Sequence, residues 1–386
     1  MKHFIGIYIT IVLLLASCAG EEPEAVQAGE GARTLTLTYA IPDPVVGTRA
    51  ENDYVESYVD ENQICDLTLL FFRPDPHGNG AFVDYVYKEL AGDAGAIYNL
   101  KINTLEIPLT GTAIQEDQTY DVLAVANLHI LFGIQFDYDE DLFTQYVTSF
   151  PTYGQAWEEL EAYLPMQPDG HGHSYYYMNG TIPMSGTTVK PAGVNQMHID
   201  LLRSLARIDV KVDDPNAASS NNDMKITLNK AQLRNVAPIA PCFRTQEVIT
   251  LPRVSSPFVI PKPGESNLIH SQLYAVETSL DVSDSRALLY DATCLLIDIK
   301  RPYIHTGADA AKTWYRLDLN VADNRQFLKR NNAYTVLITS VRGPGYSSAD
   351  EAYFRGQSLQ ITGVTIPGEW KAGEQADGKP PEIDIQ

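Results

Sequence analysis

This chain of 386 residues contains little cysteine, with only four such residues. Cys18 follows an apolar N-terminal run, which leaves Cys65, Cys242 and Cys294 for the rest of the protein. An odd number argues against a disulfide framework, and no spacing among these cysteines suits a zinc site. Cys242 and Cys294 could pair with each other, but three buried free thiols fit the sequence at least as well.

Basic residues are also scarce. The 28 Lys and Arg residues stand against 49 Asp and Glu residues, which gives a formal net charge of −21. No basic stripe is present that could neutralise phosphates, so nucleic acid is excluded as a partner. The same charge argues against docking on an anionic membrane surface. An acidic, hydrated exterior instead suits an exported protein that must stay soluble.

The N-terminal apolar run is too short to span a bilayer. Phe4 to Leu15 covers 12 residues, whereas a transmembrane helix needs roughly 20. With the small residues before Cys18, the run predicts a signal peptide over residues 1–17. The stretch Leu15-Ala16-Ser17-Cys18 resembles the lipobox of bacterial lipoproteins, which implies a lipid on the Cys18 thiol. An ordinary signal peptide followed by an unrelated cysteine is the alternative.

The motifs of common enzymes are missing. The sequence has no Gly-x-Ser-x-Gly, no His-Glu-x-x-His, no Walker loop and no Gly-x-Gly-x-x-Gly. We therefore predict no enzyme activity, no catalytic residue and no cofactor. Paired carboxylates leave little trace in a sequence, so a lipid-anchored glycan-processing enzyme is kept as a minor alternative.

One acidic cluster has the spacing that opens a calcium loop, namely Asp137, Asp139 and Asp141. The turn-making glycine is replaced by Leu142, and the bidentate glutamate of the twelfth position is replaced by Thr148. Acidic residues are also favoured at the start of a helix, where they meet the positive end of its dipole. The cluster therefore predicts a solvated helix start rather than a metal site.

Two further pairs invite a site interpretation. His171 and His173 could hold a transition metal, but no third ligand is near them in sequence, so a polar loop is the better interpretation. Arg203 and Arg207 could bind an anion. Because the residues that follow them alternate as a strand does, charge pairing at a sheet edge is the better interpretation. We predict no metal site.

The rest of the chain indicates β structure. Twenty-two Tyr, 23 Pro and 26 Gly accompany many short alternating segments. One amphipathic helix is predicted over 154–164, with Trp157, Leu160 and Leu164 on one face. Short, regularly spaced strands are typical of β-sandwiches. Strands are predicted at 64–72, 81–90, 99–109, 119–128, 197–212, 224–236, 271–278, 292–299, 315–321, 334–341 and 358–366.

A faint internal repeat suggests two similar domains. The segment Tyr120–Val125 has a counterpart in Tyr334–Thr339, and each lies in the second half of its predicted domain. The sequence therefore predicts an all-β protein with minor helices, made of two tandem β-sandwich domains. We place their boundary before residue 196, which gives domains over 50–195 and 196–386. The polar stretch 213–223 is the alternative boundary.

The segment 34–41 is an unusual first strand. Leu35, Leu37, Tyr39 and Ile41 alternate with small or hydroxyl residues, which indicates a half-buried strand. A lipid-attachment signal precedes it, and Arg49-Ala50 after it is a candidate cut site for an Arg-specific protease. If residues 18–49 are a removable propeptide, its loss withdraws four buried side chains. The alternative is that residues 34–41 stay in place as a permanent strand.

The C-terminal segment, about 357–386, has the pattern of a strand that could fill such a gap. Its candidate donor residues alternate with polar ones: Leu359, Ile361, Val364, Ile366, Ile383 and Ile385. An emptied groove would accept a strand from another chain by β-strand addition. A donor at one end and a groove at the other make a head-to-tail contact, which builds a filament.

In their order along the chain, several motifs resemble the fimbrillins of Bacteroidales, the subunits of protease-activated (type V) pili. These are the lipobox, the strand before Arg49-Ala50, and the segments 183–186, 203–207 and 274–277. The most specific is Leu328-Lys329-Arg330-Asn331-Asn332-Ala333-Tyr334, followed by a Gly-containing turn.

The resemblance implies two transthyretin-like β-sandwich domains and export to the outer-membrane surface as a lipoprotein. It also implies cleavage after Arg49, because a cut at the other candidate, Arg33, would leave the strand in place. Polymerisation by strand exchange with copies of itself or related subunits, in support of adhesion and biofilm formation, is then expected. A cleavable arginine and a donor-like tail favour a shaft subunit over a tip adhesin or an anchor subunit.

Overall fold

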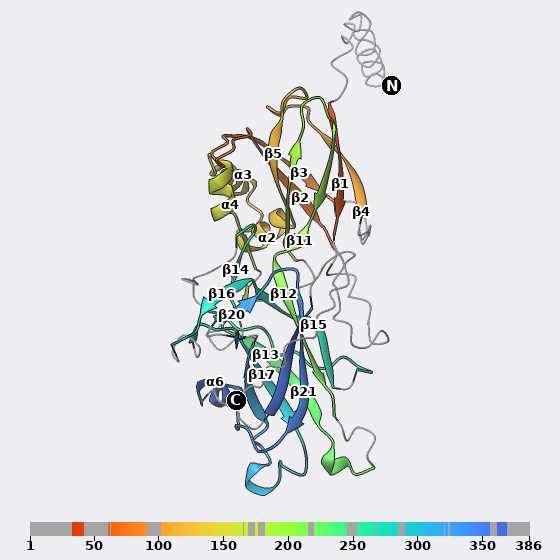
Figure 1. Cartoon of the computed structure of the whole chain (residues 1–386), viewed down its shortest axis with the longest axis vertical. Helices are drawn as coiled ribbons and strands as arrows, with labels where there is room; N and C mark the ends of the chain where they lie inside the picture. The colour runs from red at the N-terminus through yellow and green to blue at the C-terminus, as the bar shows by residue number, and fades with distance from the viewer. Residues whose placement is uncertain are drawn as a thin grey trace, which may run out of the picture.

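Short apolar runs bounded by turns form strands throughout the described part of the chain. The computed structural model describes residues 33–41, 61, 63–90, 102–164, 166–168, 174–176, 182–214, 220–244, 253–265, 267–284, 290–319, 321–322, 325–355 and 361–368. Most of their regular structure is β, arranged in several sheets, with a few short helices. The predicted all-β fold with minor helices is confirmed. Figure 1 shows an elongated molecule, with β1 to β5 in its upper part and β12 to β21 in its lower part.

Two sheets face each other in the upper part. A five-stranded sheet has the order β11-β9-β5-β2-β3, and a three-stranded sheet has the order β10-β1-β4. Apolar side chains of both sheets form one core cluster between them. The strands are β1 (Thr34–Ala40), β2 (Asp66–Phe72), β3 (Phe82–Glu89), β4 (Ile102–Pro108), β5 (Tyr120–Ala126), β9 (Met184–Lys190), β10 (Gln196–Asp200) and β11 (Leu202–Arg203).

Strand β2 is buried on both of its faces, which explains its continuous apolar sequence. Leu67, Leu69 and Phe71 point into the core between the two sheets. Leu70 and Phe72 point the other way, into a second cluster. Helices supply much of that second cluster, so the five-stranded sheet carries a sheet on one face and helices on the other.

The helices on that face are α2 (Leu128–Gln135), α3 (Glu140–Thr148) and α4 (Tyr153–Glu159). Only one was predicted, and its extent was wrong, because α4 ends at Glu159 rather than at 164. Leu160 already has extended backbone angles. The next residues form β6 (Glu161–Tyr163), which pairs with β14 (Ile239–Pro241) from the second half. Backbone pairing with a distant segment ended the helix, which sequence periodicity does not reveal.

The lower part is built around two further sheets, with the orders β15-β12-β21-β22 and β13-β17-β18. One large apolar cluster joins them. Their strands are β12 (Leu205–Val212), β13 (Thr227–Arg234), β15 (Leu268–Val276), β17 (Cys294–Lys300), β18 (Trp314–Asp318), β21 (Ala333–Val341) and β22 (Ile361–Gly368). Smaller elements are β7 (Met166–Pro168), β8 (Ser174–Tyr176), β16 (Thr278–Asp281), β19 (Val321–Ala322), β20 (Arg325–Leu328), α6 (Ala349–Arg355) and two 3₁₀ turns (Asn222–Met224, Gly307–Asp309).

Residues 196–203 pair with strands of the upper part. β10 runs parallel to β1, and β11 runs antiparallel to β9. The predicted boundary before residue 196 therefore lies ahead of two strands that belong to upper sheets. The first strand of the lower sheets is β12, which begins at Leu205. The division into two domains stays a prediction, and strand pairing favours placing it after Arg203.

The two segments of the predicted repeat share a specific contact. The Tyr120 hydroxyl accepts a hydrogen bond from the backbone N–H of Gln115 at 2.9 Å, five residues earlier. The Tyr334 hydroxyl accepts one from the N–H of Lys329 at 2.8 Å, also five residues earlier. Such a tyrosine corner fixes the entry of a sandwich strand. β5 and β21 therefore begin in the same way, as the repeat predicts.

Tyr120→Phe and Tyr334→Phe are each expected to lower the free energy of unfolding by about 1 kcal/mol. Each change leaves one partly buried backbone N–H without its hydroxyl partner and keeps the ring. Urea unfolding measures the effect, and Tyr303→Phe, at a 70% exposed side chain, is the control. A loss at only one of the two tyrosines would argue against equivalent roles.

A buried carboxyl group caps helix α2 from a neighbouring strand. Asp66 is 1% exposed, and its Oδ1 and Oδ2 accept the N–H groups of His129 at 3.1 Å and Ile130 at 2.9 Å. Burial raises the pKa of Asp66 to about 6, although the backbone donors act in the opposite direction. The carboxyl group is therefore easier to ionise in the unfolded chain than in the folded protein.

The raised pKa of Asp66 predicts a pH effect of definite sign. Its stabilising contribution is complete below the unfolded pKa of 3.8 and is lost as the pH rises through about 6. The difference in unfolding free energy between wild type and Asp66→Asn should thus change by about 2 kcal/mol from pH 4 to pH 7, in the direction that weakens wild type at high pH. Urea unfolding over this range checks it, with the exposed Asp141→Asn as control. A difference that does not vary with pH would contradict it.

Cys65, Cys242 and Cys294 are buried thiols that form no disulfide, which confirms the interpretation as three thiols over the alternative Cys242–Cys294 bridge. Burial raises the pKa of the Cys242 and Cys294 thiols to about 12. They are therefore protonated and unreactive at neutral pH. Among the helices that the structure describes, none is long and apolar enough to cross a membrane.

Candidate functional site

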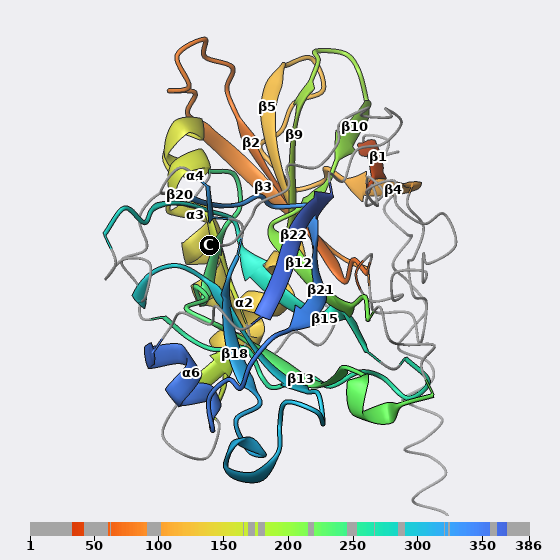
Figure 2. The same ribbon diagram turned by 60° about the horizontal axis from the view of Figure 1, so that its bottom comes forward.

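Strand β1 lies in the middle of the three-stranded sheet, between β10 and β4 (Figure 2). It runs parallel to β10, with Leu37 opposite Met197 and Tyr39 opposite Ile199. It runs antiparallel to β4, with all seven of its residues in register. A central strand with two different neighbours carries the hydrogen bonds that hold those neighbours together.

The inward side chains of β1 and of Ile41, the residue directly after it, are almost completely covered. Leu35, Leu37 and Tyr39 have 0% exposure, and Ile41 has 3%. All four belong to the core cluster between the two upper sheets. The strand that the sequence singles out therefore fills an apolar groove in the upper part of the molecule.

The outward side chains of β1 are small and polar. Thr36 donates to Glu106 Oε1 at 2.9 Å, and the hydroxyls of Thr38 and Thr104 lie 3.3 Å apart. These contacts join β1 to β4 at the exposed surface. Exposed contacts of this kind add little to stability, so the inward face provides most of the binding energy of β1.

Strand β10 forms the other wall of the groove, and β1 is its only ladder partner among the described strands. It also packs closely on β9 at Gly186. A Cβ atom at Gly186 would lie 2.2 Å from the Asp200 carbonyl oxygen and 2.7 Å from Ile199 Cγ2. Glycine is needed at this crossing, and the contact supports β10 independently of β1.

Arg33, just before β1, is tied into the fold. Its guanidinium donates to the carbonyls of Ile114 at 3.2 Å and Leu109 at 3.4 Å. Its own carbonyl accepts from the Leu109 N–H at 2.8 Å. A protease must extend the backbone around the bond that it cuts, so these contacts disfavour cleavage at Arg33.

Glu61, on the other side of the candidate cut site, is buried where the two parts of the chain meet. It is 1% exposed. Its carboxylate accepts from Arg207 Nη1 at 3.0 Å and from the Tyr274 hydroxyl at 2.6 Å, while its carbonyl accepts from Arg203 Nε at 2.9 Å. Arg203 also donates to Asn331 Oδ1 at 3.1 Å. The chain is therefore anchored to the lower part at Glu61.

The charges in this cluster compensate one another. Burial alone would lower the pKa of Arg207, but Asp209 and Glu61 raise it above its ordinary value, so the guanidinium stays charged. Burial and the Glu61 carboxylate raise the pKa of Tyr274, which therefore remains a hydrogen-bond donor. The predicted charge pairing is observed for Arg207, which pairs with Glu61 and Asp209. The contacts described for Arg203 go to the Glu61 carbonyl and to Asn331 Oδ1. The predicted place at a sheet edge is wrong for Arg207, because β12 lies between β15 and β21, but right for Arg203, because β11 is an edge strand of the five-stranded sheet.

The C-terminal candidate residues Ile361, Val364 and Ile366 lie in β22. This strand pairs antiparallel with β21 of the same chain, from Ile361 opposite Val341 to Gly368 opposite Ala333. β22 is an edge strand of a lower sheet and does not touch the ladder of β1. The structure therefore brings the four groove residues together and keeps β22 apart from them.

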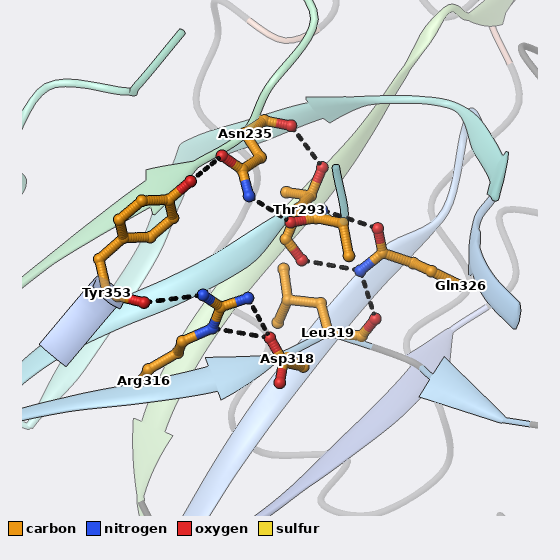
Figure 3. A network of polar contacts seen from close by, with 8 residues as sticks. Asn235, Thr293, Arg316, Asp318, Leu319, Gln326 and Tyr353 are labelled. Carbon is orange, nitrogen blue, oxygen red and sulfur yellow. Dashed lines mark hydrogen bonds and ion pairs between the residues drawn. The ribbon is translucent and has the colours of Figure 1, made fainter. Parts of the chain in front are cut away.

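Helix α6 precedes β22 and is fixed by the buried polar network of Figure 3. Arg316 of β18, 3% exposed, donates to Asp318 Oδ1 at 2.9 Å and to the Tyr353 carbonyl at 3.0 Å. The Tyr353 hydroxyl donates to Asn235 Oδ1 at 2.8 Å. The chain thus enters its C-terminal segment from a helix attached firmly to β18.

The remaining candidates divide as follows. Asp139 caps α3 by accepting the Leu142 N–H at 3.0 Å, as expected for a helix start. In the part of the chain that the structure describes, no cluster of three or more His, Cys, Asp or Glu side chains could hold a metal. Several candidates lie outside the described residues: Cys18, Arg49, Ala50, His171, His173, Leu359, Ile383 and Ile385.

Sequence reasoning did not identify the walls of the groove or its anchor. It joined β10 to β12 as one strand, although the apolar pair Leu201-Leu202 interrupts the alternation of Met197 and Ile199. It did not single out Glu61. No local signal distinguishes this glutamate, because its partners lie more than 140 residues away.

No protein-family model matches the sequence, and no curated protein matches it. Among solved structures, the tip fimbrial protein Mfa3 from Porphyromonas gingivalis with C-terminal truncation is 12% identical, with 87% of this chain and 100% of that chain covered and a TM-score of 0.48. A fimbrial assembly protein from Parabacteroides distasonis is 13% identical (87% and 95% covered, TM-score 0.45). A protein provisionally assigned to cell adhesion, from the same species, is 13% identical (89% and 99%, TM-score 0.49).

These neighbours are of the kind that the sequence resemblance indicates, fimbrial and cell adhesion proteins of Bacteroidales. Their identities and TM-scores are too low to assign a function to this chain. The function proposed below therefore depends on the groove, its strand and the flanking contacts.

Proposed function

We propose that this chain is a structural, non-enzymatic subunit of a cell-surface fimbria. It is exported as a lipoprotein through Cys18, cut after Arg49 by an Arg-specific protease and polymerised head-to-tail by strand exchange. The observation that carries the proposal is β1, a central strand with four fully covered inward side chains next to a candidate cut site. The sequence resemblance to fimbrillins points in the same direction.

The contacts on either side of Arg49 favour a cut there. Arg33 is held by hydrogen bonds, and Glu61 is anchored to the lower part of the molecule. Between Ile41 and Glu61, Arg49 is the only Arg or Lys residue. A single Arg-specific cut in this interval separates β1 from the anchored chain, with Ala50 as the new N-terminus.

Loss of β1 would leave a groove that must be refilled. Burial of four apolar side chains contributes roughly 6–12 kcal/mol, at about 1.5–3 kcal/mol each. A whole domain is stable by only about 5–15 kcal/mol, so an empty groove is not sustainable. A strand from a neighbouring subunit that lies between β4 and β10 restores both the core and the ladders.

The C-terminal segment, about 357–386, is the proposed donor within the same family of subunits. Because β22 pairs with β21 in its own chain, donation of Ile361, Val364 and Ile366 requires β22 to leave that edge. Residues 369–386, with Ile383 and Ile385, lie outside the described residues. A subunit that keeps β22 in place fits the alternative role of tip adhesin or anchor, and this pairing is the observation that favours that alternative.

The proposal is tested by treating the purified precursor with an Arg-specific protease. We expect the new N-terminus to be Ala50 and an SDS-resistant ladder to form. Arg49→Ala should block both, whereas deletion of residues 357–386 should abolish the ladder and preserve the cut. Ala50 without a ladder supports a tip subunit. The absence of any cut supports an anchor or an unrelated lipoprotein, and long polymers from the truncated subunit would disprove the donor assignment.

A further inference from the structure

The four inward positions, three in β1 and one at Ile41 directly after it, are filled by side chains of different size. Leu35, Leu37 and Ile41 are aliphatic, whereas Tyr39 is aromatic and is among the largest fully buried side chains of the described residues. Tyr39 lies opposite Asn103 of β4 and Ile199 of β10, so both walls of the groove flank it. The groove therefore contains one aromatic-sized site between positions of aliphatic size.

An aromatic site in a packed core discriminates strongly among occupants. Aliphatic positions tolerate exchanges of similar volume, whereas a small residue at an aromatic position leaves a cavity that its surroundings fill only in part. The alternation of apolar residues admits many strands to the groove. The aromatic at the third inward position is the feature that selects among them.

The outward positions of β1 place few restrictions on the side chains of a replacing strand. A shallow depression lies over the outer face of β1, lined by Thr36, Thr38, Thr104, Gln196, Met197 and His198. It leaves room for larger outward side chains than the threonines of β1. A replacing strand is therefore free to vary at alternate positions.

The tail of this chain does not supply the required pattern. Trp370 is the only aromatic residue in 357–386. With Trp370 at the Tyr39 position, the other inward positions receive Ile366, Gly368 and Ala372. If instead Leu359 and Ile361 occupy the first two positions, Gly363 falls at the aromatic site. In the frame of Val364 and Ile366, Gly368 falls there.

We infer that the preferred occupant of the vacated groove is a strand of a different protein, with the pattern apolar-x-apolar-x-aromatic-x-apolar. This inference rests on the proposed function, since it needs a groove that β1 has left. It narrows the partner from any subunit, including a second copy of this chain, to one that places Phe, Tyr or Trp at the Tyr39 site. This chain then follows another kind of subunit in the fibre more readily than it follows itself, and the ladder of the purified precursor reports the weaker joint between two copies of this chain.

The test uses the full precursor cleaved by an Arg-specific protease and fluorescent peptides that compete for the groove. The probes are the peptide of residues 33–42, its Tyr39→Phe and Tyr39→Ala variants, a scrambled peptide, and tail peptides of residues 357–370 and 362–374. Fluorescence anisotropy gives the dissociation constants. Peptide variants avoid any defect in folding of the subunit itself.

We expect the Tyr39→Phe peptide, which keeps the aromatic ring, to bind at least about tenfold more tightly than the Tyr39→Ala peptide. The Tyr39→Ala peptide and both tail peptides should bind at least about 100-fold more weakly than the parent peptide. A Tyr39→Ala or tail peptide that binds within about threefold of the parent overturns the inference and leaves the proposed function standing. If the parent peptide binds no better than the scrambled one, β1 does not vacate the groove, and the proposed function fails with the inference.

Discussion

Tyr39→Ala is expected to lower the unfolding free energy of the precursor by about 3–5 kcal/mol and to leave the cleaved, strand-free subunit unchanged. The first effect follows from a fully buried aromatic side chain whose removal opens a cavity between the two upper sheets. The second follows from the proposal that the same residue leaves with the propeptide.

Urea unfolding before and after treatment with the protease measures both effects. Thr38→Ala is the matched control, because Thr38 precedes Tyr39 on β1 but points outward. Its hydroxyl lies 3.3 Å from the hydroxyl of Thr104 at the surface. We expect this variant to change stability by less than about 1 kcal/mol in either form. A Tyr39→Ala defect that persists equally in the cleaved protein would show that the strand has not left.

The second large effect is expected at Glu61. Glu61→Ala should destabilise both the precursor and the cleaved subunit by about 3–5 kcal/mol, because the buried Arg207 loses a charged partner and Tyr274 loses its acceptor. Unlike Tyr39, Glu61 lies after the proposed cut site, and we expect it to remain in the cleaved chain. The two variants therefore separate the removable strand from the permanent scaffold.

Unfolding in urea again provides the measurement, together with a double-mutant cycle with Tyr274→Phe. The two changes share a hydrogen bond, so their effects should not add. Glu106→Gln is the control, since Glu106 is exposed and contacts Thr36 at the surface. A Glu61→Ala effect as small as that of Glu106→Gln would contradict the anchoring role.

Alternating and continuous apolar runs predicted most of the strands. β2, β3, β5 and β21 lie within two residues of their predicted limits, because their sequences are bounded by turn residues. The helices α2 and α3 were harder to foresee. Leu128 to Gln135 is apolar nearly throughout, and its first turn is capped by Asp66, a residue of a strand more than 60 positions earlier.

The candidate site was predictable in part for the same reason. The alternation of apolar and small residues in this segment determines which side chains point inward, so Leu35, Leu37, Tyr39 and Ile41 could be predicted from the sequence. What surrounds β1 is not local information. The parallel partner β10 lies more than 150 residues later in the sequence. The pairing of β22 within its own chain depends on the sheet edge that β21 presents.

The two different neighbours of β1 determine the orientation in which a strand can occupy the groove. A strand that enters in the orientation of β1 makes an antiparallel ladder with β4 and a parallel one with β10. A strand in the opposite orientation would lie parallel to β4 and antiparallel to β10. The hydrogen bonds of parallel and antiparallel ladders differ in spacing and slant, so β4 and β10 would both have to change their pairing. If fibres form as proposed, every joint then has the same sense, and a growing fibre has two chemically distinct ends.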